Sequence, residues 1–350
     1  MITSTNPHSP AAPMRRRIGG WGGAALRLTA LVLTMDCGVP PATAGTDFPG
    51  EQAGFAWLFP LNPPGPSSAR VDDDKIPIHL RRSERSFTAA QLDDLFYAPD
   101  WHPELHTPMP EVVVRGRKPA TYACGYCHLP AGQGRPENAA LAGLPAAYIV
   151  QQVQEMKSGA RRSAWHSESY RPAVLMQAVA DHVSDADLAA AADYFAAQTL
   201  PPRVKIVERE MIPRMEMQAW IYVVDPRGGT EALGQRVIEW APDFAGHEKR
   251  DADLVYSAFV PPGSVRRGRD IAMTGNGGTI LPCNSCHGRH LKGTASLPPL
   301  AGRSPTYLLR QLVAYRTGDR AGAGAAPMQA VVAKLRIEDM IAVAAYAATQ

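Results

Sequence analysis

The sequence predicts a helical fold in which one module occurs twice, with proline-rich segments before and between the copies. The first observation is an internal repeat, because Cys124 and Cys127 recur 159 residues later as Cys283 and Cys286. The second is the helical spacing of apolar residues between the repeated positions. The third is a content of 32 Pro and 30 Gly in 350 residues, which favours long irregular connections. We therefore expect two helical domains and two irregular extensions.

The repeat extends well beyond the cysteines. At the same offset of 159, several positions match: Leu141-Ala142-Gly143 with Leu300-Ala301-Gly302, Tyr148 with Tyr307, Gln152 with Gln311, and Arg161 with Arg320. Seven extra residues in the first copy, at 163–169, change the offset to 152, at which Met176-Gln177-Ala178-Val179 matches Met328-Gln329-Ala330-Val331. The two repeated domains are therefore expected at 119–200 and 261–350.

Each copy is expected to contain a short helix at the cysteine motif, a middle helix, a loop that carries a Met, and a final helix. The middle helices are expected at 145–158 and 305–317, and the final helices at 184–199 and 337–348. Ser184 can cap the first of these final helices. A first helix is expected at 264–274 in the second copy. In the first copy, 111–118 is Val-rich and expected to be extended, and 88–97 is the nearest substitute for that helix.

The N-terminus has the features of an export signal. Three Arg at 15–17 precede an apolar stretch at 24–35, and small residues at 42–44 suit cleavage after Ala44. An unstructured tail is the alternative. The stretch is shorter than the ~20 residues of a membrane span, and no later run of that kind occurs. We expect a signal peptide at 1–44 that takes Cys37 with it, and a periplasmic mature chain that reaches a membrane only through a partner.

The charge of the chain gives no indication of a nucleic-acid partner. Residues 1–44 hold four Arg and one Asp, so the remaining chain has 32 basic and 32 acidic residues. A balanced chain of this kind lacks the excess of basic residues that is typical of nucleic-acid binding.

The four remaining cysteines lie in two motifs, Cys124-Gly125-Tyr126-Cys127-His128 and Cys283-Asn284-Ser285-Cys286-His287. A Cys-x-x-Cys pair alone also fits a structural disulfide, a redox dithiol or half of a zinc site. The His after the second Cys makes each motif the attachment signature of a c-type haem. Two such motifs predict two covalently bound haems c, with iron bound by His128 and His287. A zinc site that pools the four thiolates and a redox dithiol stay as alternatives.

Each iron needs a sixth ligand if the protein is to transfer electrons without an open coordination position. A thioether is neutral and soft, so it favours Fe(II). Met176 lies 48 residues after His128 and Met328 lies 41 after His287. Met is often a core residue, but the matched placement predicts that both are ligands. The rivals are Met156, His166 and His182 for the first haem, and Met340 and His290 for the second; Met156 and Met340 have the spacing of ordinary helix positions.

These residues resemble the class I cytochromes c, and more closely the tandem two-haem cytochromes of the periplasm. The resemblance covers about half of the sequence and depends on the two motifs, on Leu-Ala-Gly with the following Tyr and Gln, and on the placed Met. It implies an all-α fold of two tandem cytochrome c domains, in which Gly268 lies close to the last helix near Tyr346. It also implies that a carbonyl accepts a hydrogen bond from each ligating His. Pro299 matches that role in the second copy and Ala140 in the first.

The leading hypothesis is a periplasmic electron carrier, not an enzyme. Its redox partners would be a dehydrogenase or quinol-linked donor and an oxidase or other terminal acceptor. One alternative is the cytochrome subunit of a dehydrogenase complex. The other is a dihaem peroxidase, which needs one iron with an open or displaceable site.

Two segments, 45–118 and 201–260, have no counterpart in the tandem family. The first is proline-rich, contains an acidic run at 72–74, and is expected either to wrap across both domains or to dock a partner enzyme. Its histidines are expected to be surface or core residues, not ligands: His79, His102 and His106. In the second segment, 230–240 is expected to be helical and 204–224 to cover the seam between the domains.

Overall fold

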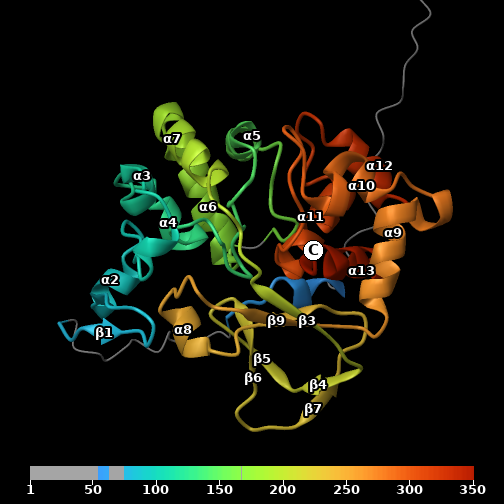
Figure 1. Ribbon diagram of the computed structural model, residues 1–350, viewed down its shortest axis with the longest axis horizontal. Coiled ribbons are helices and arrows are strands. Elements are labelled where there is room, and N and C mark those ends of the chain that lie inside the picture. Colours follow the sequence, from blue (N-terminus) through green and yellow to red (C-terminus); the bar gives the residue numbers. More distant parts are fainter. Residues whose placement is uncertain (1–53, 63–74, 167) are drawn as a thin grey trace, which may run out of the picture. The chain divides into compact units, whose positions relative to one another are not determined.

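A computed structural model describes residues 54–62, 75–166 and 168–350 (Figure 1). The expected signal peptide at 1–44, Cys37 within it and the acidic run at 72–74 lie outside the described residues. Within those ranges, no helix combines the length and the apolar character that a membrane span requires.

The first copy of the repeat is helical. Its helices are α4 (Cys124–His128), α5 (Ala146–Lys157), α6 (Arg171–His182) and α7 (Asp185–Ala196). The hydroxyl of Ser184 accepts a hydrogen bond from the backbone N–H of Asp187 at 3.1 Å, so the expected cap of α7 is confirmed. Figure 1 shows α5, α6 and α7 next to one another in green.

The second copy has the same order of helices and adds one at its start. They are α9 (Ser264–Gly278), α10 (Cys283–His287), η3 (Arg289–Leu291), α11 (Pro305–Thr317), α12 (Ala326–Val332) and α13 (Ile337–Ala348). The regular turns of α9 end at Thr274, because the next three residues have positive φ. At Gly268, a Cβ would lie 1.9 Å from the carbonyl oxygen of Ala342 on α13. The expected close approach of these helices is therefore confirmed.

The segments that carry the two Met residues are helices, and the prediction that they are loops is wrong. Met176 lies on α6 and Met328 on α12. Pro172 and Pro327 lie in the first turns of these helices. Proline is well tolerated there, since its fixed φ suits the helix and its missing N–H would have no partner within it.

Residues 111–114 are also helical, contrary to the extended conformation expected for 111–118. They form α3 (Glu111–Val114), and Thr88 caps a separate helix, α2 (Ala89–Asp93). Val112 and Val113 pack in one buried cluster with Phe195 of α7. This burial outweighs the preference of Val for strands. It makes α3, and not 88–97, the helix beside the final helix of the first copy.

The segment between the copies folds mainly as a β-sheet, so the all-α prediction holds only for the repeats. Five strands pair in the order β3 (Val204–Glu208), β9 (Tyr256–Val260), β8 (Ile238–Trp240), β6 (Ile221–Val224) and β5 (Met215–Gln218). The pairs β3–β9 and β6–β8 are parallel, and β8–β9 and β5–β6 are antiparallel. A separate antiparallel pair joins β4 (Met211–Pro213) to β7 (Thr230–Ala232).

The helix expected at 230–240 is therefore wrong, since β7 and β8 occupy that stretch. Leu233 and Ile238 belong to a buried cluster with Tyr222 and Phe259, which come from other parts of the sheet. These partners lie too far away in the sequence for the spacing inside 230–240 to indicate them. After β8 the chain forms one short helix, α8 (Phe244–Glu248).

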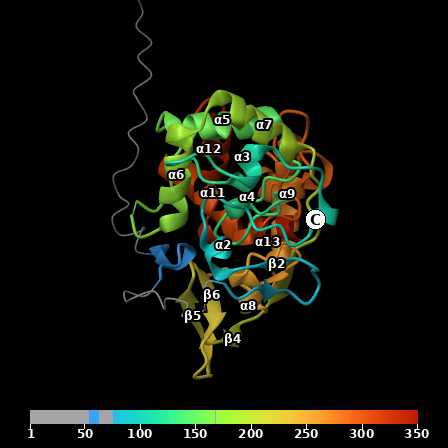
Figure 2. The same ribbon diagram turned by 90° about the vertical axis from the view of Figure 1, so that its left-hand side faces the viewer.

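The described parts of the N-terminal extension pack against later segments of the chain. They contain η1 (Ala56–Leu58), β1 (Ile78–His79), β2 (Ser86–Phe87) and η2 (Pro103–Leu105). Phe59 stacks on Trp165 with ring centroids 5.7 Å apart, and Arg310 donates a hydrogen bond to the carbonyl of Leu58 at 3.2 Å. Figures 1 and 2 both show the β1–β2 pair beside α8. This agrees with the expected wrapping extension.

The two copies meet through residues that the repeat itself supplies. Arg161 donates a hydrogen bond to the hydroxyl of Tyr307 at 3.2 Å, and Arg320 donates one to the hydroxyl of Tyr148 at 3.2 Å. These pairs are exchanged by the offset of 159, so the contact has approximate two-fold symmetry. Val204 lines a small cavity together with residues of both copies, so the segment 204–224 reaches the seam at its first residue.

Candidate cofactor sites

The first motif forms α4, with its two cysteines one turn apart and His128 at the last position. The side chain of His128 is buried, and its Nδ1 lies 2.8 Å from the carbonyl oxygen of Ala139. Burial lowers the pKa of His128, so its imidazole is neutral near neutral pH. A neutral ring that donates from Nδ1 leaves the lone pair of Nε2 free for a metal.

The second motif repeats this arrangement on α10. His287 is buried, and its Nδ1 lies 2.9 Å from the carbonyl oxygen of Pro298. Burial lowers the pKa of His287 as well. Because Pro298 corresponds to Ala139 at the offset of 159, both histidines are oriented by the same backbone position.

The carbonyls expected to orient the histidines, those of Ala140 and Pro299, are one residue too late. Both accept hydrogen bonds from Arg303 instead, each at 2.6 Å, and the carbonyl of Ala142 accepts a third at 2.9 Å. The Arg303 side chain is buried, so its N–H groups need protein acceptors. Burial lowers the pKa of Arg303 to about 10, which leaves it charged at neutral pH. Arg303 therefore connects the two copies, because it binds the carbonyl that directly follows the histidine-orienting carbonyl in each of them.

The four cysteines of the motifs form no disulfide with one another. Burial raises the pKa of Cys124 to about 12 and that of Cys283 to about 11. Thiol-disulfide chemistry needs the thiolate, which the surroundings of Cys124 and Cys283 disfavour. Within the described residues, no three His, Cys, Asp or Glu side chains form a group that could hold a metal ion. The geometry thus supports neither the pooled zinc site nor the redox dithiol.

A cavity of about 210 Å³ lies beside α4. Cys124, Cys127 and His128 line it, and so do Met156 and Met176. Most of the remaining wall is apolar, including Leu141, Leu144, Ile149, Val153, Val179 and Leu188. Two thiols, a neutral imidazole and a thioether on one apolar cavity are the donor set that a covalently attached haem requires.

A buried polar group of this cavity also fits a bound cofactor. The hydroxyl of Tyr170 lies at the cavity wall and has no hydrogen-bond partner among the described residues. Burial raises the pKa of Tyr170, so the hydroxyl keeps its proton and can donate to a polar substituent. Tyr170 directly follows the seven-residue insertion of the first copy, which was the only sequence signal that could have indicated it.

The rival ligands lie in different surroundings. Met156, which has the spacing of an ordinary helix position, lines the same cavity as Met176. Either thioether could therefore ligate the first iron. Met340 is fully buried in the core of the second copy, as its spacing suggests. His166 pairs with Asp319 at 2.6 Å and does not line the cavity. His182 and His290 are exposed.

Met328, the predicted ligand of the second haem, and the histidines of the N-terminal extension all lie outside the cavity beside α4. Met328 is half-buried on α12. His79 is exposed, whereas His102 is buried and lies 3.0 Å from a carboxylate oxygen of Asp251. Nδ1 of His106 lies 2.8 Å from a backbone carbonyl oxygen. None of these three histidines lines the cavity beside α4.

Comparison with known proteins connects the site to one family, although no family model matches the chain. Cytochrome c-554(548) of Halomonas halodenitrificans is 42% identical over 72 residues, which cover 20% of this chain and 87% of that protein. Cytochrome c4 of Azotobacter vinelandii is 26% identical over 227 residues, covering 64% of this chain and 82% of the relative. A protein of Stutzerimonas stutzeri named thiosulfate dehydrogenase electron acceptor is 29% identical over 212 residues, covering 59% and 68%.

Proposed function

Because the chain belongs to the two-haem class I cytochromes c, we propose that it carries electrons between other redox proteins, with one haem c attached to each copy of the repeat. The observation that supports this most directly is the cavity beside α4, where two thiols, a neutral imidazole and a thioether share one apolar wall. Bound haem supplies an iron that changes between Fe(II) and Fe(III).

Each side chain of the sites has a definite role in this proposal. Cys124 and Cys127 in the first copy, and Cys283 and Cys286 in the second, would hold a haem through thioether bonds to its two vinyl groups. His128 and His287 ligate the iron through Nε2, while the backbone carbonyls at their Nδ1 atoms fix the ring orientation. Met176 and Met328 would supply a thioether as the second protein ligand of each iron, and the apolar wall of the cavity beside α4 would exclude water.

The organisation of the chain is part of the same proposal. Residues 1–44 act as a signal peptide, 45–118 as an N-terminal extension, 119–200 and 261–350 as the cytochrome c domains, and 201–260 as the segment between them. The export features of the N-terminus and the similarity to cytochromes c4 support a periplasmic location.

We propose a dehydrogenase as the electron donor and an oxidase or other terminal acceptor as the recipient. One relative is named as the electron acceptor of a thiosulfate dehydrogenase, which supports a donor of this class. The second candidate is a cytochrome subunit held within a dehydrogenase complex, because an acceptor named after one dehydrogenase has that enzyme as its partner. Purification of the chain from its host separates the two, since only a subunit retains a catalytic partner.

Haem content and ligation test the proposal together. The mature holoprotein is expected to carry two haems per chain, seen as added mass and as haem quantified after denaturation. Oxidised protein is expected to show the charge-transfer band of thioether-ligated iron at both sites. Met176→Leu should remove half of that band, whereas Met156→Leu and the core variant Met340→Leu should leave it intact. A chain without added haem would overturn the proposal. Loss of half of the band in Met156→Leu would show that Met156, and not Met176, ligates the first iron.

A further inference from the structure

We infer that protein partners exchange electrons with this chain at the second copy, on a surface around α10 that fits an acidic redox protein. The surface consists of Met273, Leu281, Lys292 and Leu297, and we call it the α10 face. The inference rests on the proposed attachment of haem to both motifs. It goes further because it states which of the two haems a partner can approach.

The loop after the first motif is buried, and the matching loop of the second copy is not. Residues 129–137 are buried without exception. At the offset of 159 they correspond to 288–296, where only Leu291 is buried. Cys127 is half-buried, while the matching Cys286 is exposed. The two attachment sites therefore differ in access although their ligand geometry is the same.

Segments outside the repeat produce this difference by covering α4. The guanidinium carbon of Arg250 lies 3.4 Å from the ring centre of Tyr126, and Arg250 donates a hydrogen bond to the Tyr126 carbonyl at 3.1 Å. Ala98 and Val113 close over Gly125, where an added Cβ would lie 2.9 Å from atoms of both. We call these segments, 95–98, 111–115 and 247–250, the α4 cover.

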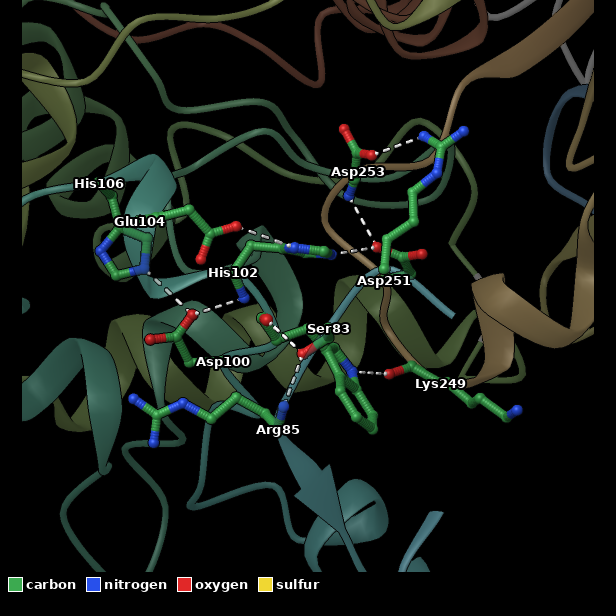
Figure 3. A network of polar contacts seen from close by, with 11 residues as sticks. Ser83, Arg85, Asp100, His102, Glu104, His106, Lys249, Asp251 and Asp253 are labelled. Atoms are coloured by element: carbon green, nitrogen blue, oxygen red, sulfur yellow. Dashed lines mark hydrogen bonds and ion pairs between the residues drawn. The ribbon is translucent and has the colours of Figure 1, made fainter. Parts of the chain in front are cut away.

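Polar contacts next to the α4 cover hold its segments together. Figure 3 shows His102 pointing toward Asp251, and their side-chain atoms are 3.0 Å apart. Trp101 is buried and donates from Nε1 to the carbonyl of Lys249 at 2.7 Å. These bonds join the N-terminal extension to the segment between the copies. The α4 cover is thus held in place by specific contacts, and it shields the first motif from solvent.

The α10 face has the apolar character of an interaction surface. Leu281 is 68% exposed, Met273 40% and Leu297 39%. Each is close to the haem attachment site. Leu281 lies two residues before Cys283, Leu297 precedes the proline that orients His287, and the thioether of Met273 is 3.6 Å from the side chain of Asn284 on α10. Large exposed apolar side chains grouped in this way are typical of sites where another molecule binds.

The charges around the α10 face are almost all positive. Residues 264–302 contain one acidic residue, Asp270, and five basic residues, namely Arg266, Arg267, Arg269, Arg289 and Lys292. Of these, Arg267 is paired with the buried carboxylate of Asp339 at 2.6 Å, so the other four supply the positive charge. Lys334 lies in the turn after α12 and donates a hydrogen bond to the carbonyl oxygen of Thr279 at 3.4 Å. It adds a positive charge near Leu281. A positive rim speeds the approach of an acidic partner and orients it. A small apolar centre with a charged rim suits the weak, short-lived contacts of electron transfer.

An anionic membrane could also bind a basic apolar surface, but the position of the α10 face favours a protein. The surface is centred on the helix that holds the second haem. Proximity to the haem does not affect lipid binding, whereas it shortens the distance over which a redox protein must transfer an electron.

The test measures reduction of the oxidised holoprotein by photoreduced flavodoxin, an acidic one-electron donor protein. Lys292→Glu is expected to lower the second-order rate constant about tenfold at low ionic strength, with the difference shrinking as salt is added. The matched control is Lys205→Glu, an exposed residue of β3, which makes the same charge change away from the α10 face. It should alter the rate less than twofold. Leu281→Ser should slow the reaction at every salt concentration.

Several outcomes would overturn the inference. Equal slowing by Lys292→Glu and Lys205→Glu would mean that only the overall charge matters. Binding to phosphatidylglycerol vesicles that Lys292→Glu abolishes, with unchanged flavodoxin rates, would assign the surface to lipid. A dimer that Leu281→Ser dissociates would assign it to a second copy of the chain. Haem content is measured first, because a chain without two haems overturns the proposed function, whereas equal rates in a two-haem chain overturn only this inference.

Discussion

Gly125 and Asn284 occupy the same position in the two copies of the repeat, yet their surroundings differ. A side chain on Gly125 would meet Ala98 and Val113, whereas the Asn284 side chain is half-buried and reaches only as far as Met273. Both residues lie in helices that hold a buried histidine against a backbone carbonyl in the same way. The repeat therefore sets the geometry of each site, while the added segments set its access.

The largest expected effect comes from giving the first site the residue of the second. Gly125→Asn should lower the free energy of unfolding by about 3 kcal/mol, because its side chain must displace the α4 cover. Guanidinium unfolding of the holoprotein measures this. The reverse exchange, Asn284→Gly, should cost less than about 1 kcal/mol, since a short helix loses only propensity. Equal costs for the two exchanges would show that the two sites are packed alike.

The second effect concerns Arg303, whose counterpart in the first copy is Leu144. Arg303→Met leaves three backbone carbonyls without their donor and should lower the free energy of unfolding by roughly 2 kcal/mol. The matched control, Leu144→Met, should cost less than about 1.5 kcal/mol. If Arg303→Met cost no more than its control, the hydrogen bonds of Arg303 would not contribute to the free energy of unfolding.

A smaller effect is expected when the α4 cover is loosened at Arg250. Arg250→Met removes the cation over the ring of Tyr126 and two hydrogen bonds to carbonyls, at a cost of about 1.5 kcal/mol. Hydrogen exchange should then become faster in α4 and stay unchanged in α10. Faster exchange in both helices would contradict a cover that is specific to the first copy.

The smallest effect is a pH dependence that comes from His247 in the α4 cover. Burial, and then the nearby charge of Arg135, lower the pKa of His247 well below 6.5. The folded chain therefore keeps this ring neutral, while the unfolded chain binds a proton below pH 6.5. The free energy of unfolding should fall as the pH drops below that value, by at most about 1.4 kcal/mol per pH unit for one proton. Unfolding of His247→Gln between pH 7 and 5 should show a smaller slope, and an identical slope would exclude this ring as the cause.

Much of the repeat was predictable because its signals are local. The middle and final helices of the second copy were expected at 305–317 and 337–348, and α11 and α13 have those bounds. Ser184 caps α7 as expected. Helix starts, caps and apolar spacing all involve residues within a few positions of one another, so a single sequence displays them.

Other elements were missed because their partners are distant. The strand at Ile238–Trp240 pairs with β6 and β9, and its pattern alone fitted a helix. The carbonyl that orients each histidine lies one residue earlier than expected, and Arg303, which replaces Leu144 of the first copy, donates to the next carbonyl of both copies.

The two attachment motifs and the short helices that hold them follow from the sequence alone, because they depend on spacing within a short stretch of chain. The residues able to ligate iron were predicted from the motifs and from the internal repeat. Only the tertiary structure decided that one motif is shielded and the other open. That difference depends on contacts such as Arg250 with Tyr126, which are 124 residues apart. Burial is a property of the neighbours that surround a residue in space, and the spacing of residues along the chain does not contain it.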